Sequence, residues 1–332
     1  MMDRRTLIGS VMLAVTAATV ASAAVAQDRG ERMQRMRDYI EQKRALKGDP
    51  AETRITRPGT TRYSFQHGGL TREYIVHVPA NLPRGPAPLL LALHGGGGDM
   101  DQQAKNYGLK EKADQAGFIV VFPSGSSRMP GGILATWNAG TCCGGAVKQG
   151  VDDVGFLQEV VARVGRQTNV DRTRVFSTGM SNGGLMSYRL ACDAPGLLRG
   201  IAPVAGTDNT ARCTPSRPTA VIHFHARDDD HVPFEGGKGP KTRADTSFTS
   251  VPATIAKWVG IDRAVPQPRR VLSVPGAACD LHAAGPGGAP VELCVTDTGG
   301  HSWPGIATAR SGKNPSMAIS ANDLMWDFFK AL

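Results

Sequence analysis

Short hydrophobic runs alternate along the chain with segments that have a helical period. The runs that are apolar almost throughout occupy residues 88–93, 118–122, 201–205 and 220–224. Each is too short for a typical helix, and such runs are typical of strands buried on both faces of a sheet. Helix-forming patterns occupy residues 102–115, 152–164 and 318–332. The alternation predicts the α/β class, with a mostly parallel, twisted sheet and helices on both of its faces.

A different pattern precedes the first buried run. Tyr63 and Phe65 alternate with polar residues, a His-Gly-Gly turn follows at residues 67–69, and residues 74–78 alternate again. A period of two on either side of a glycine turn predicts an antiparallel hairpin. We expect this N-terminal hairpin at the edge of the sheet.

The first 26 residues have the pattern of an export signal. Arg4 and Arg5 precede an alanine-rich apolar stretch over residues 6–25, and small residues at positions 24 and 26 predict cleavage before Gln27. The arginine pair with its following residues is similar to a twin-arginine signal. A membrane anchor is the alternative, but the run lacks a basic stop behind it. We therefore expect a secreted or periplasmic protein without a stable membrane anchor.

The rest of the chain divides into an arm and one large domain. Residues 27–58 are rich in charge of both signs, and Met33, Met36 and Ile40 form only a narrow apolar stripe at helical spacing. Residues 59–332 are long enough to bury a full core. The expected organisation is a signal peptide at 1–26, a charged N-terminal arm at 27–58 and an α/β catalytic domain at 59–332.

Charge and cysteine content narrow the class of protein. The formal net charge of +9 is spread along the chain without a block of like charge, which gives no support to nucleic-acid binding. Export would make the six cysteines disulfide partners. Cys192 and Cys213 bracket one predicted strand, and Cys279 and Cys294 flank a predicted turn, so these two pairings are favoured. The adjacent Cys142 and Cys143 are left to pair with each other or with other partners. The cysteines lack zinc-ligand spacing, so we expect no metal site from them.

The most informative stretch is RVFSTGMSNGGLMS at residues 174–187. Apolar residues lead into Gly179-Met180-Ser181-Asn182-Gly183, and a helix-compatible run follows. A serine at such a strand-to-helix turn is held in a strained conformation with its hydroxyl exposed, and the flanking glycines allow the backbone to close around it. A glycine-rich surface turn is the alternative reading of the pentapeptide alone.

A serine hydroxyl needs a base and an orienting carboxylate to become a nucleophile. Residues 225–231, HARDDDH, follow one predicted strand, and residues 299–304, GGHSWP, follow another. The order serine, aspartate, histidine is that of the α/β-hydrolase triad. The histidine is then His301, and the aspartate is Asp228, Asp229 or Asp230.

Two further features are compatible with this chemistry. The glycine loop at residues 94–98 follows a buried strand, so that the Gly96 and Asn182 amides could form an oxyanion hole. The loop lacks the lysine of a phosphate-binding loop and the spacing of a dinucleotide fingerprint. As a rival, His223 and His225 face one side of a strand and could hold a metal with nearby aspartates, but this would leave the serine turn unexplained.

Taken together, these motifs resemble the secreted poly(3-hydroxybutyrate) depolymerase-like and feruloyl esterase-like proteins, related to carbohydrate esterase family 1 of the α/β-hydrolase superfamily. The resemblance covers residues 60–332 and rests on LALHGGGG, GFIVVFPSG, TWNAGTCCG, VDDVGFL, GMSNGG, HARDDDHVPFEGG and GGHSWPG. It implies Asp229 as the catalytic acid, by alignment of His225 and Pro233. It also implies that Trp137 and Trp303 are apolar walls of the substrate pocket.

The expected function is a secreted serine carboxylic-ester hydrolase that needs no metal and no organic cofactor. Its small or oligomeric ester substrates are hydroxyalkanoate esters or feruloyl and acetyl esters of plant polysaccharide. The alternatives are a non-catalytic secreted binding protein that keeps the hydrolase shell and a serine peptidase on the same fold.

Overall fold

Ten strands form one sheet in the part of the chain that the computed structural model describes. That part comprises residues 54–55, 57–82, 84–129, 132–242, 245–307 and 314–332, and it lies within the unit Asp49–Leu332. The predicted signal peptide and almost all of the predicted arm lie outside the described residues. The boundaries drawn for them therefore stay predictions.

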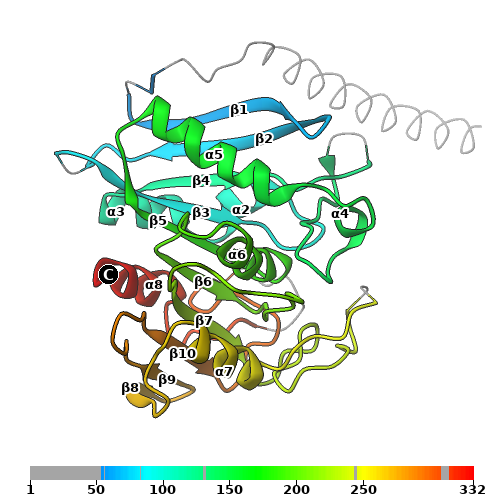
Figure 1. The fold of residues 1–332 in the computed structure, drawn as a ribbon, viewed down its shortest axis with the longest axis vertical. Coiled ribbons are helices and arrows are strands. Elements are labelled where there is room, and N and C mark those ends of the chain that lie inside the picture. The colour runs from blue at the N-terminus through cyan, green and yellow to red at the C-terminus, as the bar shows by residue number, and fades with distance from the viewer. Residues whose placement is uncertain (1–53, 56, 83, 130–131, 243–244, 308–313) are drawn as a thin grey trace, which may run out of the picture. The chain divides into compact units, whose positions relative to one another are not determined.

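The sheet is parallel in its centre and antiparallel at both edges (Figure 1). Its order is β1-β2-β4-β3-β5-β6-β7-β10-β9-β8, in which the run from β4 to β10 is parallel. The strand bounds are β1 Gly59–His67, β2 Leu70–Val78, β3 Ala87–Leu93, β4 Ile119–Pro123, β5 Val170–Met180, β6 Gly200–Val204, β7 Ala220–Ala226, β8 Arg269–Val274, β9 Ala277–His282 and β10 Val291–Thr296.

Helices cover both faces of this sheet, as Figure 1 shows. Leu89, Leu91 and Leu93 of β3 pack into the core with α5, α6 and α7, whereas Leu90 and Ala92 pack into the opposite core with α2, α3 and α8. This alternation is why the run of residues 88–93 is apolar throughout. The helix bounds are α2 Met100–Asn106, α3 Leu109–Ala116, α4 Gly144–Lys148, α5 Asp153–Gln167, α6 Asn182–Asp193, α7 Val251–Ile261 and α8 Ala321–Lys330.

The predicted α/β architecture is confirmed, with the N-terminal hairpin as β1 and β2 and the four apolar runs as strands. The helix-forming pattern over residues 102–115 does not form one continuous helix. The chain forms α2 and α3 instead, with Gly108 between them at a φ of 63°, a conformation that favours glycine. The antiparallel edge strand β8 and the helix α7 were not predicted.

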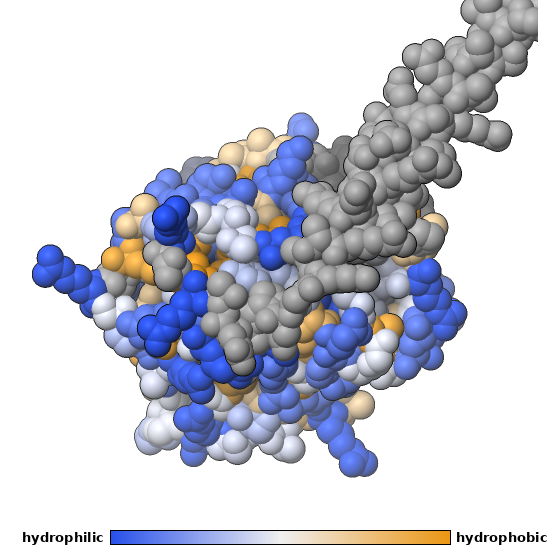
Figure 2. All heavy atoms as spheres, turned by 90° about the horizontal axis from the view of Figure 1, so that it is seen from above, coloured by the Kyte–Doolittle hydropathy of each residue, from blue (hydrophilic) through white to orange (hydrophobic). Residues whose placement is uncertain are grey.

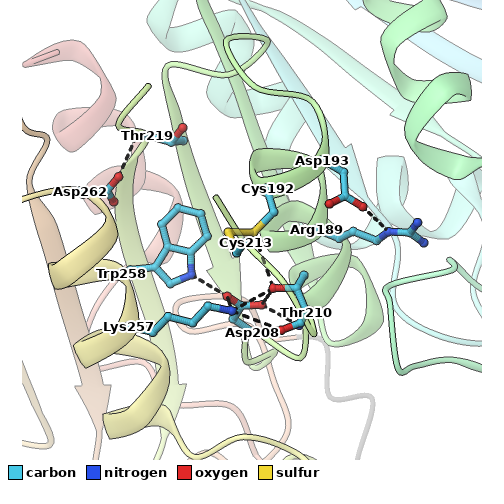
Figure 3. The surroundings of a disulfide bond; sticks show 10 residues. All are labelled: Arg189, Cys192, Asp193, Asp208, Thr210, Cys213, Thr219, Lys257, Trp258 and Asp262. Carbon is cyan, nitrogen blue, oxygen red and sulfur yellow. Dashed lines mark hydrogen bonds and ion pairs between the residues drawn. A yellow bond between two sulfur atoms is a disulfide. The ribbon is translucent and has the colours of Figure 1, made fainter. Parts of the chain in front are cut away.

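The six cysteines form three disulfides: the two pairs that the sequence favoured, and Cys142 with Cys143, whose pairing the sequence left open. Cys279 and Cys294 face each other across β9 and β10. Cys192, on α6, is bonded to Cys213, which lies within the loop between β6 and β7 (Figure 3). This second disulfide attaches the loop to the helix that begins at the serine turn.

A buried carboxylate holds the same loop from inside. Both oxygens of Asp208 are occupied: Thr210 donates its amide and hydroxyl to Oδ1, and the Trp258 indole donates to Oδ2 at 2.9 Å. Lys257 Nζ lies 2.8 Å from Oδ2 and neutralises the charge (Figure 3). Burial of a carboxylate is tolerated when it is paired and hydrogen-bonded in this way. The loop after β6 is therefore fixed at Asp208 and at Cys213.

The surface of the described residues is mixed in polarity. On the face in Figure 2, hydrophilic side chains surround smaller hydrophobic areas. Among the described residues, no helix has the length and apolar character needed to cross a membrane.

One buried carboxyl makes stability depend on pH. Asp262 follows α7 and accepts a hydrogen bond from the Thr219 amide at 2.8 Å (Figure 3), while its Oδ2 has no hydrogen-bond partner among the described residues. Burial raises the pKa of Asp262 from 3.8 to about 7, although the Thr219 bond opposes the shift. A raised carboxyl pKa means that stability is greatest below the unfolded value and falls as pH rises from about 4 to about 7.

We expect Asp262→Asn to remove this loss, because asparagine keeps the acceptor and does not ionise. The gain in unfolding free energy over the wild type should be about 2–3 kcal/mol larger at pH 8 than at pH 5. Urea unfolding of both proteins at the two pH values measures it. If the difference in unfolding free energy between the variant and the wild type were the same at both pH values, Asp262 would not ionise in this range in the folded protein.

Candidate active site

Ser181 occupies a strained turn between β5 and α6. Its φ is 56° and its ψ is −118°, and its amide donates to the Val204 carbonyl at 2.8 Å. A Cβ on Gly179 would overlap the Gly183 carbonyl group, and a Cβ on Gly183 would overlap the Leu93 carbonyl oxygen. Only glycine fits these two positions, and this close approach lets a serine stand clear between strand and helix.

Topology brings the other two residues of the predicted triad to the same edge of the sheet. Ser181 follows β5, Asp229 follows β7 and His301 follows β10, and these strands belong to the parallel run. The carboxyl ends of parallel strands share one edge, which is where ligands bind in open α/β sheets. His301 Nδ1 lies 2.8 Å from Asp229 Oδ2.

The protonation of this pair follows from its contacts. Burial alone would raise the pKa of Asp229, but the charge of His301 and hydrogen bonds from His301 and Val232 outweigh it and lower the pKa to about 2. Asp229 is thus an ionised acceptor, so His301 Nδ1 carries the proton and donates it. Nε2 of His301 is left as the basic nitrogen, as a general base requires.

The three consecutive aspartates have three different contacts. Besides binding His301, Asp229 accepts the amides of His231 and Val232 through Oδ1, at 2.8 and 2.9 Å. Asp228 accepts the Gly300 amide at 2.8 Å and so holds the loop that carries His301. Asp230 pairs with His231 and with Lys241. The position that the family resemblance implied, Asp229, is the one that binds the histidine ring.

The rival metal site at His223 and His225 does not fit the structure. His225 Nε2 donates to the Val232 carbonyl at 2.8 Å, so that its Nδ1 accepts from His223 Nε2 at 3.0 Å. The remaining His223 nitrogen then accepts from the Tyr188 hydroxyl at 2.8 Å. Burial lowers the pKa of both histidines, which keeps them neutral. All four ring nitrogens are engaged, and none is directed at a metal.

The glycine loop lies against the serine turn. A Cβ on Gly96 would be 3.5 Å from the Asn182 Cβ, so the two proposed oxyanion donors belong to adjacent backbone segments. The Gly125 amide donates to His94 Nε2 at 2.8 Å, and His94 Nδ1 therefore donates to the Gly95 carbonyl. The histidine before the glycines thus connects two loops at this edge.

The Asn182 side chain has a role that the sequence did not reveal. Its Oδ1 accepts the Trp137 amide at 2.7 Å and its Nδ2 donates to the Trp137 carbonyl at 3.1 Å. The Trp137 indole in turn donates to the His94 carbonyl at 2.9 Å. These bonds connect the residue after the serine, the long loop between β4 and α4 that carries Trp137, and the glycine loop into one unit. The side chain therefore supports the site in which the amide was expected to act.

The two tryptophans expected to line the pocket are interior residues. Trp137 is 0% exposed and Trp303 is 1% exposed. The Trp303 indole donates to Asn322 at 3.0 Å, and its ring packs on Tyr107 at 4.8 Å between centroids. Because both indoles are buried with their N–H groups satisfied by protein acceptors, they pack the loops. Their expected role as apolar walls of the substrate pocket stays a prediction.

A buried ion pair holds the same long loop at Asn138. Arg72 Nη2 lies 2.6 Å from Asp153 Oδ1, and both side chains are almost fully buried. Asp153 Oδ2 accepts the Asn138 amide at 2.7 Å. The second aspartate of the VDDVGFL motif therefore positions the residue next to Trp137, while Asp152 caps α5 through the Gly155 amide.

His231 is a site residue that the sequence analysis missed. Its ring stacks on His301 with centroids 4.7 Å apart and planes 17° apart, and Asp230 holds its Nδ1 at 2.7 Å. Burial and the nearby His301 lower the pKa of His231. Asp229, His231 and His301 bring possible ligand atoms within 4.8 Å of one another. The Nδ1 atoms of His231 and His301 are already bound to the carboxylates of Asp230 and Asp229.

Comparison with known proteins finds esterases among the relatives of this chain. The family model described as Esterase PHB depolymerase matches residues 72–229. Feruloyl esterase B of Piromyces equi is 27% identical over 238 residues, which cover 70% of this chain and 42% of the relative. The Nocardia uniformis subsp. tsuyamanensis protein NocK, for which esterase is a suggested activity, is 29% identical over 77% of this chain and 78% of its own length.

The fold matches a solved structure of similar size. The acetyl xylan esterase from Aspergillus awamori superposes with a TM-score of 0.57 at 15% identity, covering 82% of this chain and all of the other. At this identity the match shows the fold. The sheet topology and this superposition give the chain the α/β-hydrolase fold, and its sequence is similar to esterases of the PHB depolymerase and feruloyl esterase type.

Proposed function

We propose that the chain is a serine carboxylic-ester hydrolase with Ser181 as nucleophile, His301 as general base and Asp229 as the carboxylate that orients the base. The observation that carries the proposal is the 2.8 Å bond between His301 Nδ1 and Asp229 at the sheet edge that presents Ser181 on a strained turn. Relatives with esterase names support the reaction class.

The proposed reaction has two halves. His301 Nε2 removes the proton of the Ser181 hydroxyl as the oxygen attacks the acyl carbonyl, and the amides of Asn182 and Gly96 bind the resulting oxyanion. The imidazolium, held by Asp229, then protonates the leaving alcohol, and an acyl-enzyme remains. Water, deprotonated by the same histidine, attacks the acyl-enzyme and releases the acid.

The proposed substrates are feruloyl or acetyl esters of plant polysaccharide, with hydroxyalkanoate oligoesters as the second candidate. Feruloyl esterase B and the bifunctional acetylxylan esterase/xylanase XynS20E of Neocallimastix patriciarum support the first class. The PHB depolymerase family model supports the second. The chain spans only 42% and 23% of those two relatives, so their substrates serve here as a guide.

A substrate panel tests this proposal. We expect hydrolysis of methyl ferulate or acetylated xylan, detected as ferulate or acetate, at a kcat/KM at least about tenfold above that for hydroxybutyrate trimers. The reverse ranking would assign the chain to the second class. Turnover of a peptide substrate without turnover of any ester would contradict the proposal.

We also propose that the protein acts outside the cytoplasm. Its three disulfides support this location, because such bonds persist in oxidising compartments and are rare in reducing ones.

A further inference from the structure

A cavity lies at the opposite edge of the sheet from Ser181. It has a volume of about 640 Å³ and is lined by residues that precede or begin the parallel strands. Arg172 and Arg174 lie near the start of β5, Arg199 immediately precedes β6, and Arg217 lies three residues before β7. Since β7 has seven residues, its two ends are roughly 20 Å apart. The cavity is therefore remote from the triad.

The chemical character of the cavity is basic. Four arginines line it, and none of its described lining residues is acidic. Asp171, adjacent in sequence, pairs with Arg174 at 2.7 Å. Hydrogen bonds from Thr173 and Arg174 lower the pKa of Asp171 to about 2, so it is ionised and offsets one of the four charges. The carboxylate of Leu332, which also lines the cavity, offsets a second charge, so two guanidinium charges remain in excess at this edge.

Two of these arginines contact anionic groups and two do not. Arg217 Nη2 donates to the Gly196 carbonyl at 2.7 Å, whereas Arg199 Nη2 donates to an oxygen of the Leu332 carboxylate at 2.9 Å. The Arg172 guanidinium lies over Gly165, about 3.5 Å from where a Cβ would be. A bond to a peptide carbonyl, as at Arg217, orients a guanidinium without neutralising it. The charges of Arg172 and Arg217 thus stay available to an anion.

Apolar residues in the lining of the cavity strengthen the attraction between the arginines and an anion. Leu197, Leu198, Pro218 and Ala289 supply apolar surface beside the guanidinium groups. Charges near low-dielectric walls attract counter-ions more strongly than charges in open solvent. The planar guanidinium fork matches both carboxylate and phosphate oxygens in a bidentate geometry.

We propose that this cavity binds a small multivalent anion that carries two or more carboxylate or phosphate groups. The arginines come from three neighbouring strands, and strand spacing separates their backbones by about 5 Å per step. An anion with several charged groups can reach more than one of them at once. A volume of several hundred Å³ is also that of a small-molecule site and exceeds what a single monovalent ion needs.

Calorimetric titration of the full chain at constant ionic strength tests the site. Citrate and pyrophosphate are the two probes, with sodium chloride as the monovalent control. We expect saturable binding of at least one probe with a dissociation constant of about 1 mM or lower. The double substitution Arg199→Gln with Arg217→Gln should weaken it by at least about tenfold, because two charge-assisted contacts are lost. Binding of citrate alone would assign the site to carboxylates, and binding of pyrophosphate alone to phosphates.

A matched control separates site binding from general charge. The double substitution Arg62→Gln with Lys105→Gln also removes two positive charges, but from β1 and α2, which lie away from the cavity. This variant should bind like the wild type. Arg172→Gln with Arg174→Gln is a second test if the first double variant does not fold, as judged by circular dichroism. Absence of saturable binding, or equal weakening by the control, would overturn the proposal, and neither outcome depends on ester hydrolysis.

Discussion

Asp229→Asn is expected to lower kcat for p-nitrophenyl acetate about ten-thousandfold, which is the usual effect of removing the carboxylate from a serine–histidine–aspartate triad. In the structure this carboxylate accepts from His301 Nδ1 at 2.8 Å and from two backbone amides. Asparagine can turn its amide toward the imidazole and so favour the wrong tautomer. The proton would then sit on Nε2, and the histidine could no longer take a proton from Ser181.

The neighbouring aspartates are matched controls. Asp228→Asn keeps an acceptor for the Gly300 amide, and Asp230→Asn keeps an acceptor for His231. Each should lower kcat by no more than about tenfold, because the hydrogen bond at stake is preserved. Steady-state kinetics of the three variants and the wild type make the comparison. A larger loss at position 228 or 230 than at position 229 would refute the assignment of the carboxylate.

Ser181→Ala is expected to lower kcat by about a millionfold, since removal of the nucleophile of a triad disables the other members as well. The far-ultraviolet circular dichroism spectrum should not change, because the hydroxyl makes no hydrogen bond within the serine turn that the fold requires. Hydrolysis of p-nitrophenyl acetate measures the loss. Retention of more than about a thousandth of the wild-type rate would contradict a nucleophilic role.

A second substitution at this position checks that the fold is intact. Ser181 has a positive φ of 56°, and glycine adopts such a conformation without strain. Ser181→Gly should therefore be inactive and also more stable than the wild type by about 1 kcal/mol, measured by urea unfolding. A loss of stability in this variant would mean that the serine side chain supports the turn.

Much of the fold follows from local pattern, and the misses have physical causes. The buried strands are recognisable because β3 and β4 are apolar on both faces. β8 was missed because nearly all of its residues are exposed, so that no hydrophobic alternation marks it. The break between α2 and α3 depends on Gly108 at a φ of 63° and on Tyr107 packing against Trp303, a contact between residues far apart in the chain.

The candidate site also contains residues that the local sequence predicts and residues whose placement depends on long-range contacts. Ser181 and His301 stand in sequence contexts that predict a turn and a loop after a strand, so their positions could be inferred. The sequence alone could not choose among three adjacent aspartates, because the choice depends on which carboxylate faces a loop 72 residues away. The stacking of His231 on His301 and the clamp between Asn182 and Trp137 are also long-range contacts. Burial of both tryptophans is a tertiary outcome that no local motif records.

The central claim is that Ser181 is a nucleophile activated by His301. It is tested most directly by treating the folded protein with a fluorophosphonate probe and locating the label by mass spectrometry of the digested chain. We predict one label per chain, on the peptide that contains Ser181, and its absence in Ser181→Ala. Labelling of another serine, or no labelling of the folded wild-type protein, would contradict the account.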